Sequence, residues 1–137
     1  MHINIEFLIV AYFISLFVDW IFQWDWQAVN KSKWVEGNRV NAFFAVVTHS
    51  LIYATLIGFI LYVFPFKLVP SNTYDLVWYT LFLSHIIIDT RIPVKWIMRF
   101  KGMSWKQIND TQNFGFMHIG IDHRLHEIVL VILAMLV

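Results

Sequence analysis

The sequence predicts an all-α, polytopic integral membrane protein, a bundle of four transmembrane helices in one domain over residues 1–137. Composition is the first reason, because 59% of the 137 residues are hydrophobic and only 14% are charged. Soluble domains have roughly 45–50% and about 25%. The second reason is that the hydrophobic residues gather in four stretches, each close to the roughly 20 residues that cross a bilayer. The chain also contains no cysteine. A disulfide scaffold and thiolate-bound zinc are therefore excluded, and any metal must be held by His and carboxylate side chains.

The first two stretches predict spans at residues 4–24 and 42–64. At a rise of about 1.5 Å per residue, each is long enough for a hydrocarbon core of about 30 Å. The second stretch carries no formal charge and a single imidazole, His49. Pro65 follows it and is expected to end the helix, because proline lacks the backbone N–H that a helix needs.

The other two stretches are more polar and predict spans at residues 74–92 and 114–137. Pro93 follows the third span and should end or kink it. Residues 93–100 then mix aromatic and basic side chains, which is typical of a short amphipathic helix in the headgroup layer. The fourth span is polar in its first half and purely apolar from Ile128 onward.

Lysine and arginine set the predicted orientation. Most of them lie in the connections over residues 25–41 and 90–113, whereas the connection between the second and third spans has only Lys67. By the positive-inside rule the first and third connections are cytoplasmic, and both termini are periplasmic. A formal charge of +1 gives no reason to expect a nucleic-acid partner. The predicted partner is the lipid bilayer, and the sequence is compatible with an oligomer.

Six ionisable residues fall at one depth of the predicted bundle, near its cytoplasmic side. They come from all four spans and are Asp19, His49, His85, Asp89, Asp122 and His126. Each ionisable group inside a bilayer costs roughly 2.5–3.5 kcal/mol on insertion scales, so six at one level are tolerable only if they face each other. We therefore expect these side chains to converge inside the bundle.

The spacing of these residues indicates a metal site. His85 and Asp89 are four residues apart, as are Asp122 and His126, and residues at this spacing share one face of a helix. Two helices would each offer a His/Asp pair to a divalent cation, and further donors can come from the other spans. Zinc is the default ion for a His-rich set, while the carboxylates make manganese or magnesium plausible. The predicted metal ligands are His49, His85, Asp89, Asp122 and His126.

Several of these residues also have a purely structural interpretation. A lone imidazole such as His49 often forms hydrogen bonds between membrane helices. Asp19 could pair with Lys31 or Lys33 at the membrane surface, because both kinds of side chain can reach the interface. Three further residues are expected to support the site without binding the metal: His118, His123 and Arg124.

A family resemblance is carried by the stretches SLFVDWIFQWDWQAVNK, THSLIY, SHIIID and DHRLHEIV. Nearly the whole chain resembles a family of small bacterial and phage inner-membrane proteins of unknown function. Their successive helices typically show His-x3-Asp-x3-Gln followed by a Lys, a lone His, His-x3-Asp, and Asp-Gln-x2-His. The resemblance adds Gln23 and Lys31 to the site. The sequence departs from the pattern at Ser15, which replaces the first His, and at His123, which replaces the Gln of the fourth helix. Loss of the first His argues against a two-ion site more than against a one-ion site.

That family is similar in its His/Asp layout to predicted membrane-bound metal-dependent hydrolases. The resemblance implies hydrolysis of a lipid or amphiphile by metal-activated water at the inner membrane. Asp19 is then the expected general base, as the least committed carboxylate at that depth. The residues expected to bind substrate or to support the ligands are Gln23, Lys31, His118, His123 and Arg124.

Two other functions would use the same residues. A proton or metal-ion transporter would use them as a relay or transit site. A phage or defence-related membrane protein would use them as a structural metal site. Residues 54–64 and 128–137, in the predicted periplasmic half, contain no acidic, basic or histidine side chain. This favours a closed site over a path through the membrane.

Overall fold

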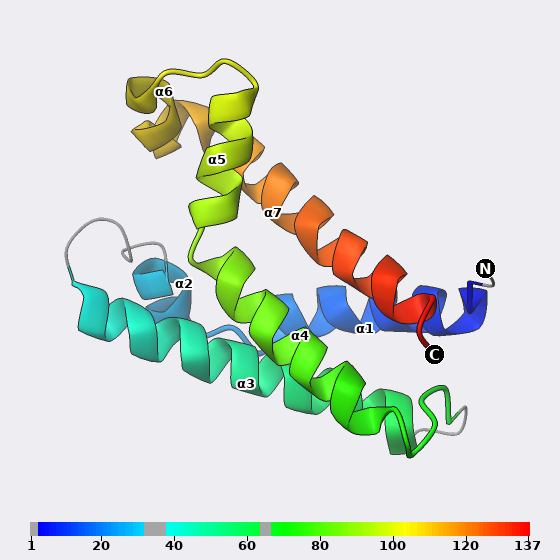
Figure 1. Cartoon of the computed structure of the whole chain (residues 1–137). Helices are drawn as coiled ribbons and strands as arrows, with labels where there is room; N and C mark the ends of the chain where they lie inside the picture. The colour runs from blue at the N-terminus through cyan, green and yellow to red at the C-terminus, as the bar shows by residue number, and fades with distance from the viewer. Residues whose placement is uncertain (1–2, 32–37, 64–66) are drawn as a thin grey trace.

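The computed structural model describes residues 3–31, 38–63 and 67–137, and over these residues the regular structure is helical. The helices, labelled in Figure 1, are α1 (Ile5–Ile21), α2 (Asp25–Lys31), α3 (Arg39–Val63), α4 (Tyr74–Asp89), α5 (Ile92–Phe100), α6 (Trp105–Asn109) and α7 (Thr111–Ala134). The predicted all-α class is confirmed.

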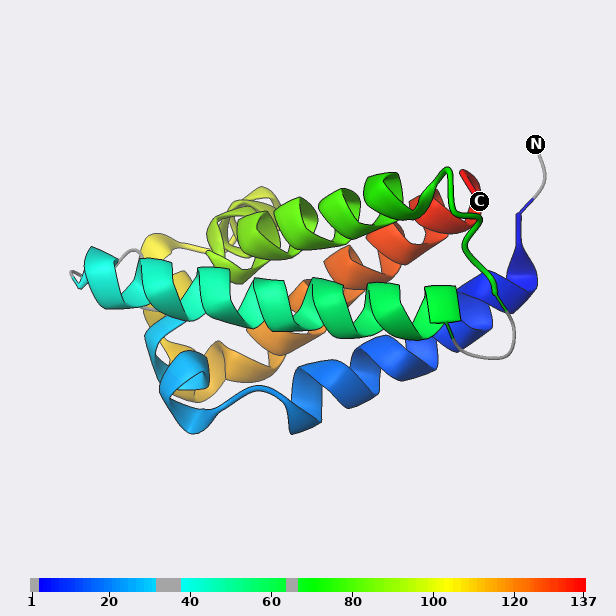
Figure 2. The same cartoon turned by 90° about the horizontal axis from the view of Figure 1, so that it is seen from below.

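The four long helices α1, α3, α4 and α7 correspond to the four hydrophobic stretches of the sequence. They run alongside one another (Figure 2), and each packs against two of the others in the cyclic order α1, α3, α4, α7. Both chain ends lie at one end of this bundle, where the Asn4 N–H donates a 2.8 Å hydrogen bond to the Ala134 carbonyl. The short helices α2, α5 and α6 lie at the opposite end.

The first long helix is shorter than predicted. α1 ends at Ile21, before the expected boundary at residue 24, and the chain then bends by 98° into α2. The side chain of Gln27 holds this bend. Its carbonyl oxygen accepts the Trp24 N–H at 3.1 Å, and its amide donates to the Thr48 hydroxyl of α3 at 3.0 Å. α2 therefore folds back against α3, an element that the sequence did not predict.

The third long helix is also shorter than predicted. α4 ends at Asp89, before the expected boundary at residue 92, and Arg91 takes up a left-handed conformation with a φ of 58°. Pro93 stands in the first turn of α5. The missing N–H of a proline is harmless there, because the first turn has no carbonyl partners for its N–H groups. Pro93 therefore helps to begin the short helix that was predicted after the third span.

α5 and α6 form a small packed unit at one end of the bundle. Val94 and Met98 of α5 are buried against Ile108 of α6. The other face of α5 leaves Trp96 and Phe100 exposed. This arrangement gives α5 the amphipathic character that the sequence predicted.

The main hydrophobic core lies between the long helices, in the half of the bundle that holds the chain ends. It includes Phe7, Ala11, Ile57, Leu61, Leu81, Leu130 and Leu133. The buried polar side chains, including His49, His85 and Asp89, lie in the other half. The bundle is therefore divided along its length into an apolar half and a polar half.

Among the described residues, α3 alone is both long and apolar enough to cross a membrane as one helix. It has 25 residues and a mean hydropathy of 2.0, and the bent pair α1 and α2 would make a second span if the two are taken together. α1 and α4 have 17 and 16 residues, fewer than the roughly 20 that a span needs. α7 has 24 residues but contains Asp122, Arg124 and Glu127.

Candidate metal centre

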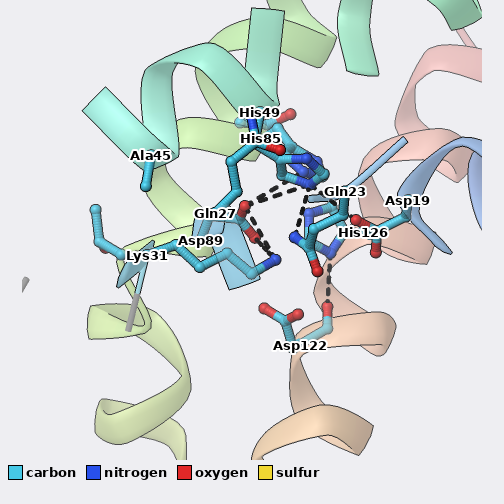
Figure 3. A network of polar contacts seen from close by, with 12 residues as sticks. Asp19, Gln23, Gln27, Lys31, Ala45, His49, His85, Asp89, Asp122 and His126 are labelled. Atoms are coloured by element: carbon cyan, nitrogen blue, oxygen red, sulfur yellow. Dashed lines mark hydrogen bonds and ion pairs between the residues drawn. The ribbon is translucent and has the colours of Figure 1, made fainter. Parts of the chain in front are cut away.

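Side chains from the four long helices converge in the polar half of the bundle (Figure 3). We refer to Asp19, His49, His85, Asp89 and His126 as the His/Asp cluster. α1 supplies Asp19, α3 supplies His49, α4 supplies His85 and Asp89, and α7 supplies His126. Of the six side chains that the sequence predicted to converge, the structure brings these five together.

His49 connects α1 to α4. Its Nε2 atom lies 2.9 Å from Oδ1 of Asp19 and 3.7 Å from Oδ2 of Asp89. The side-chain amide nitrogen of Gln23 lies 3.2 Å from the same Nε2 atom. His49 therefore links two helices, as expected if its role is structural. Its position also makes it a possible metal ligand.

Lys31 reaches the cluster because α2 folds back against α3. Its Nζ atom lies 3.2 Å from both carboxylate oxygens of Asp89, and both side chains are buried. The sequence suggested Asp19 as the possible partner of Lys31, and the observed partner is Asp89. An ammonium group bound by both oxygens offsets the cost of burying this carboxylate.

His85 is completely buried at the centre of the cluster. Its ring centroid lies 4.9 Å from that of His49 and 4.4 Å from that of His126. The Nε2 atom lies 3.4 Å from Oδ2 of Asp89, but neither ring nitrogen makes a hydrogen bond among the described residues. Such a buried polar group costs about 1–3 kcal/mol unless it gains a partner.

The orientation of His126 leaves one ring nitrogen suited to a metal. Its Nδ1 atom lies 3.0 Å from the backbone carbonyl of Asp122. Because a carbonyl only accepts hydrogen bonds, Nδ1 must carry the proton and donate it. In the neutral ring the Nε2 atom is then a lone-pair donor, and it has no hydrogen-bond partner among the described residues.

Two overlapping sets of side chains in the cluster could hold a metal ion. One is Asp19, His49 and His85, and the other is His85, Asp89 and His126. Within each set the potential ligand atoms lie within 4.8 Å of one another. Imidazole nitrogen and carboxylate oxygen are ligands of zinc and of other divalent first-row metals. Both sets use His85, so this residue is the common element of the candidate centre.

The other predicted site residues lie around the cluster or apart from it. Asp122, predicted as a ligand, belongs to neither set, although its Oδ1 atom is buried without a hydrogen-bond partner among the described residues. His118 is turned toward α6, where its Nε2–H donates a 2.8 Å hydrogen bond to the Ile108 carbonyl. His123 and Arg124 line a groove on the outer face of α1 and α7.

Sequence reasoning missed Tyr53. Its ring stacks on His85 with a centroid distance of 3.8 Å and is almost completely buried. Tyr53 lies four residues after His49, so the helical spacing that linked the His/Asp pairs could have placed it on the same face. Ser15 is buried, and its hydroxyl donates to the Tyr12 carbonyl at 2.8 Å.

Acidic side chains outnumber basic ones at the site. Asp19, Asp89 and Asp122 carry three negative charges when ionised, and the Lys31 ammonium provides one positive charge. With neutral imidazoles, two negative charges remain in a largely buried region. A single divalent cation would neutralise them, and unpaired buried charges are strongly unfavourable.

The chain was compared with protein families, curated proteins and solved structures. No family model, curated protein or solved structure matches it.

Proposed function

We propose that this protein is a four-span protein of the bacterial inner membrane that binds a divalent cation in the His/Asp cluster and hydrolyses a lipid or amphiphile. The observation that carries the proposal is the set His85, Asp89 and His126, whose potential ligand atoms lie within 4.8 Å of one another. The unpartnered nitrogens of His85 and His126 support it, because a cation would supply the missing partners.

The division of the bundle supports four spans. The buried ionisable side chains, His49, His85 and Asp89 among them, lie toward the end that also holds α2, α5 and α6, and the half near the chain ends has an apolar core. A bilayer favours this arrangement when charged groups face one another inside the protein. In this topology α5 lies in the cytoplasmic headgroup layer with Trp96 and Phe100 toward the lipid, and both termini are periplasmic.

Zinc is the first candidate for the ion, since three of the five cluster residues are histidines. Manganese and magnesium are alternatives because carboxylates are also present. His49, His85, Asp89 and His126 are the proposed ligands, and Asp122 is a further donor whose buried Oδ1 atom has no hydrogen bond among the described residues. The charge balance favours one ion over two.

The proposed reaction is hydrolysis with Asp19 as general base. A bound divalent cation supplies Lewis acidity and makes water a stronger nucleophile at neutral pH. Asp19 suits the role of base because its side chain is 16% exposed, against 1% for Asp89. The hydrogen-bonded contact with His49 orients the carboxylate of Asp19. Asp19 would take a proton from the attacking water and return it to the leaving group.

Transport and a structural metal site are the alternative functions. The apolar core between the cluster and the chain ends favours a closed site over an ion path. A structural site would also join four helices, so it must be separated from hydrolysis by experiment.

The test is elemental analysis of the detergent-purified protein together with an assay of lipid ester and phosphoester cleavage. We expect one ion per chain in the wild type and in His118→Ala, whose histidine lies outside the cluster. His85→Ala should lose the ion. Asp19→Asn should keep the ion and lose cleavage. A wild type without a stoichiometric ion would refute the metal centre, and unfolding on chelation without any cleavage would identify a structural site.

A further inference from the structure

A groove runs along the outer face of the bundle between α1 and α7. Its wider part has a volume of about 720 Å³ and is walled by Leu16, Phe17, Trp20, Phe116, Ile119 and Gly120. A second part of about 360 Å³ continues past Tyr12 toward the end of the bundle that holds the chain ends. Both volumes fall in the range of roughly 300–1,000 Å³ that is usual for small-molecule sites.

A charged pair interrupts this apolar surface. Arg124 and Glu127 line both parts of the groove, and Nη1 of Arg124 donates a hydrogen bond to Oε2 of Glu127. The Arg124 side chain is 77% exposed. A guanidinium has five N–H donors in a planar fork, so one carboxylate oxygen leaves it able to bind another anion. Charged groups on a lipid-facing surface are costly and usually mark a functional site.

None of the described residues that line the groove belongs to the His/Asp cluster. Arg124 lies two residues from Asp122 and two from His126 on α7, and residues at that spacing point to different faces of a helix. The groove is therefore a surface separate from the candidate metal centre.

We propose that this groove binds an anionic phospholipid of the bilayer, with its phosphate on the Arg124 guanidinium and its acyl chains along the apolar walls. The pairing of phosphate with arginine identifies the headgroup, because the guanidinium fork matches phosphate oxygens. The length and the apolar lining of the groove match the acyl chains of the lipid. The inference goes beyond the proposed function, because the groove and the His/Asp cluster are lined by different residues.

The test uses spin-labelled lipids in phosphatidylcholine vesicles that contain the full-length protein. Electron paramagnetic resonance measures how much of each labelled lipid the protein immobilises. The wild type should favour labelled phosphatidylglycerol over labelled phosphatidylcholine roughly fivefold, the effect expected for one basic residue near an anionic lipid. Arg124→Gln should abolish this preference. Glu127→Gln breaks the same ion pair but keeps the guanidinium, so it should retain or increase the preference.

A second pair of variants tests the apolar part of the groove. A Cβ at Gly120 would meet no atom within 4 Å, so Gly120→Leu should fill the groove without a clash and reduce the preference. Gly115 on the same helix also has open space at its Cβ but is not a wall of the groove. Gly115→Leu should therefore leave the preference unchanged.

Three results would overturn the inference: equal immobilisation of the two lipids by the wild type, equal effects of Arg124→Gln and Glu127→Gln, or a cross-linked dimer that Gly120→Leu converts to monomer. The last result would show that a second copy fills the groove. Metal content is measured on the same samples. A preference without bound metal would refute the proposed function but support the groove, whereas bound metal without a preference would refute the groove alone.

Discussion

At His85 the ring is wholly buried, and yet neither nitrogen has a hydrogen-bond partner among the described residues. Stacking on Tyr53 stabilises the ring by roughly 0.5–1.5 kcal/mol at most, which does not replace two missing hydrogen bonds. Oδ2 of Asp89 lies 3.4 Å from Nε2 of the ring but forms no hydrogen bond with it. The local environment therefore suits a metal ligand better than a structural histidine.

Lys31 and a cation should compete for Asp89, because both would bind the same carboxylate oxygens. We predict that Lys31→Met destabilises the metal-free protein by about 3–5 kcal/mol, since it leaves a buried carboxylate without its counter-charge. Added zinc should supply the positive charge that Asp89 loses with Lys31. Thermal unfolding in detergent, with a chelator and with zinc, should show a larger zinc-dependent stabilisation for Lys31→Met than for the wild type.

Lys95→Met provides the matched control for this prediction. Lys95 is also largely buried, but its Nζ atom donates to Oδ1 of Asn109 at 3.1 Å, away from the cluster. Lys95→Met should lower the stability of the protein by the same amount in zinc and in chelator. If Lys31→Met gains no more from zinc than Lys95→Met does, Lys31 and the cation do not share Asp89.

For single residues, the sequence predicted where the side chains of the site lie better than it predicted which groups they contact. The four-residue spacing of His85 and Asp89, and the shared depth of His49 and Asp19, follow from helical periodicity alone. The ion pair of Asp89 with Lys31 depends on the bend after α1, which no periodic pattern encodes. Roles for Asp122 and His123 stay predictions.

Among the elements, α2 depends on one side chain. Gln27 is almost fully buried and makes hydrogen bonds to the Trp24 N–H and to the Thr48 hydroxyl. We predict that Gln27→Ala destabilises the protein by about 1–3 kcal/mol, the value of two buried hydrogen bonds. Denaturant unfolding measures this loss. Gln112→Ala, at an exposed position of α7, should change stability by less than about 0.5 kcal/mol. Equal effects of the two variants would show that Gln27 does not hold the bend.

The start of α7 should carry a pH dependence of its own. The Asp110 carboxylate caps the helix by accepting the Asn113 N–H at 3.2 Å and the Asn113 side-chain amide at 2.7 Å. These hydrogen bonds lower the pKa of Asp110. The stabilisation is therefore complete above the ordinary aspartate pKa of about 3.9 and is lost as the pH falls through the lower folded-state value.

Asp110→Asn tests this pH dependence, because asparagine keeps a capping oxygen but does not titrate. The melting temperatures of the wild type and the variant should differ at neutral pH and converge in acid. A difference that stays constant down to about pH 3 would exclude the Asp110 carboxylate as its source.

For the whole molecule, hydrophobic patterning predicted the four long helices and their order, because each stretch must bury an apolar face. It placed the ends of α1 and α4 three residues too late. Those ends are set by Gln27 and by the left-handed turn at Arg91, which are tertiary and conformational effects. The same corrections shorten two of the predicted spans, so topology is the property of the whole molecule that most requires measurement.

Single cysteines can measure the topology directly, since the natural chain has none. Three exposed positions lie in different connections or at their edges: Val40 at the start of α3, Ser71 before α4 and Gln112 at the start of α7. With four spans, a cysteine at Ser71 should react with a membrane-impermeant maleimide added to spheroplasts, which have lost the outer membrane but keep the inner membrane intact. Cysteines at Val40 and Gln112 should react only after the inner membrane is opened, because positive charge keeps both connections in the cytoplasm. If α3 alone crosses the membrane, Ser71 and Gln112 must instead lie on the same side and Val40 on the other. A cysteine at Gln112 that is labelled from the same side as Val40 indicates a four-span bundle. A cysteine at Gln112 that is labelled from the same side as Ser71 indicates a single span. Both conclusions hold whichever way the protein is inserted.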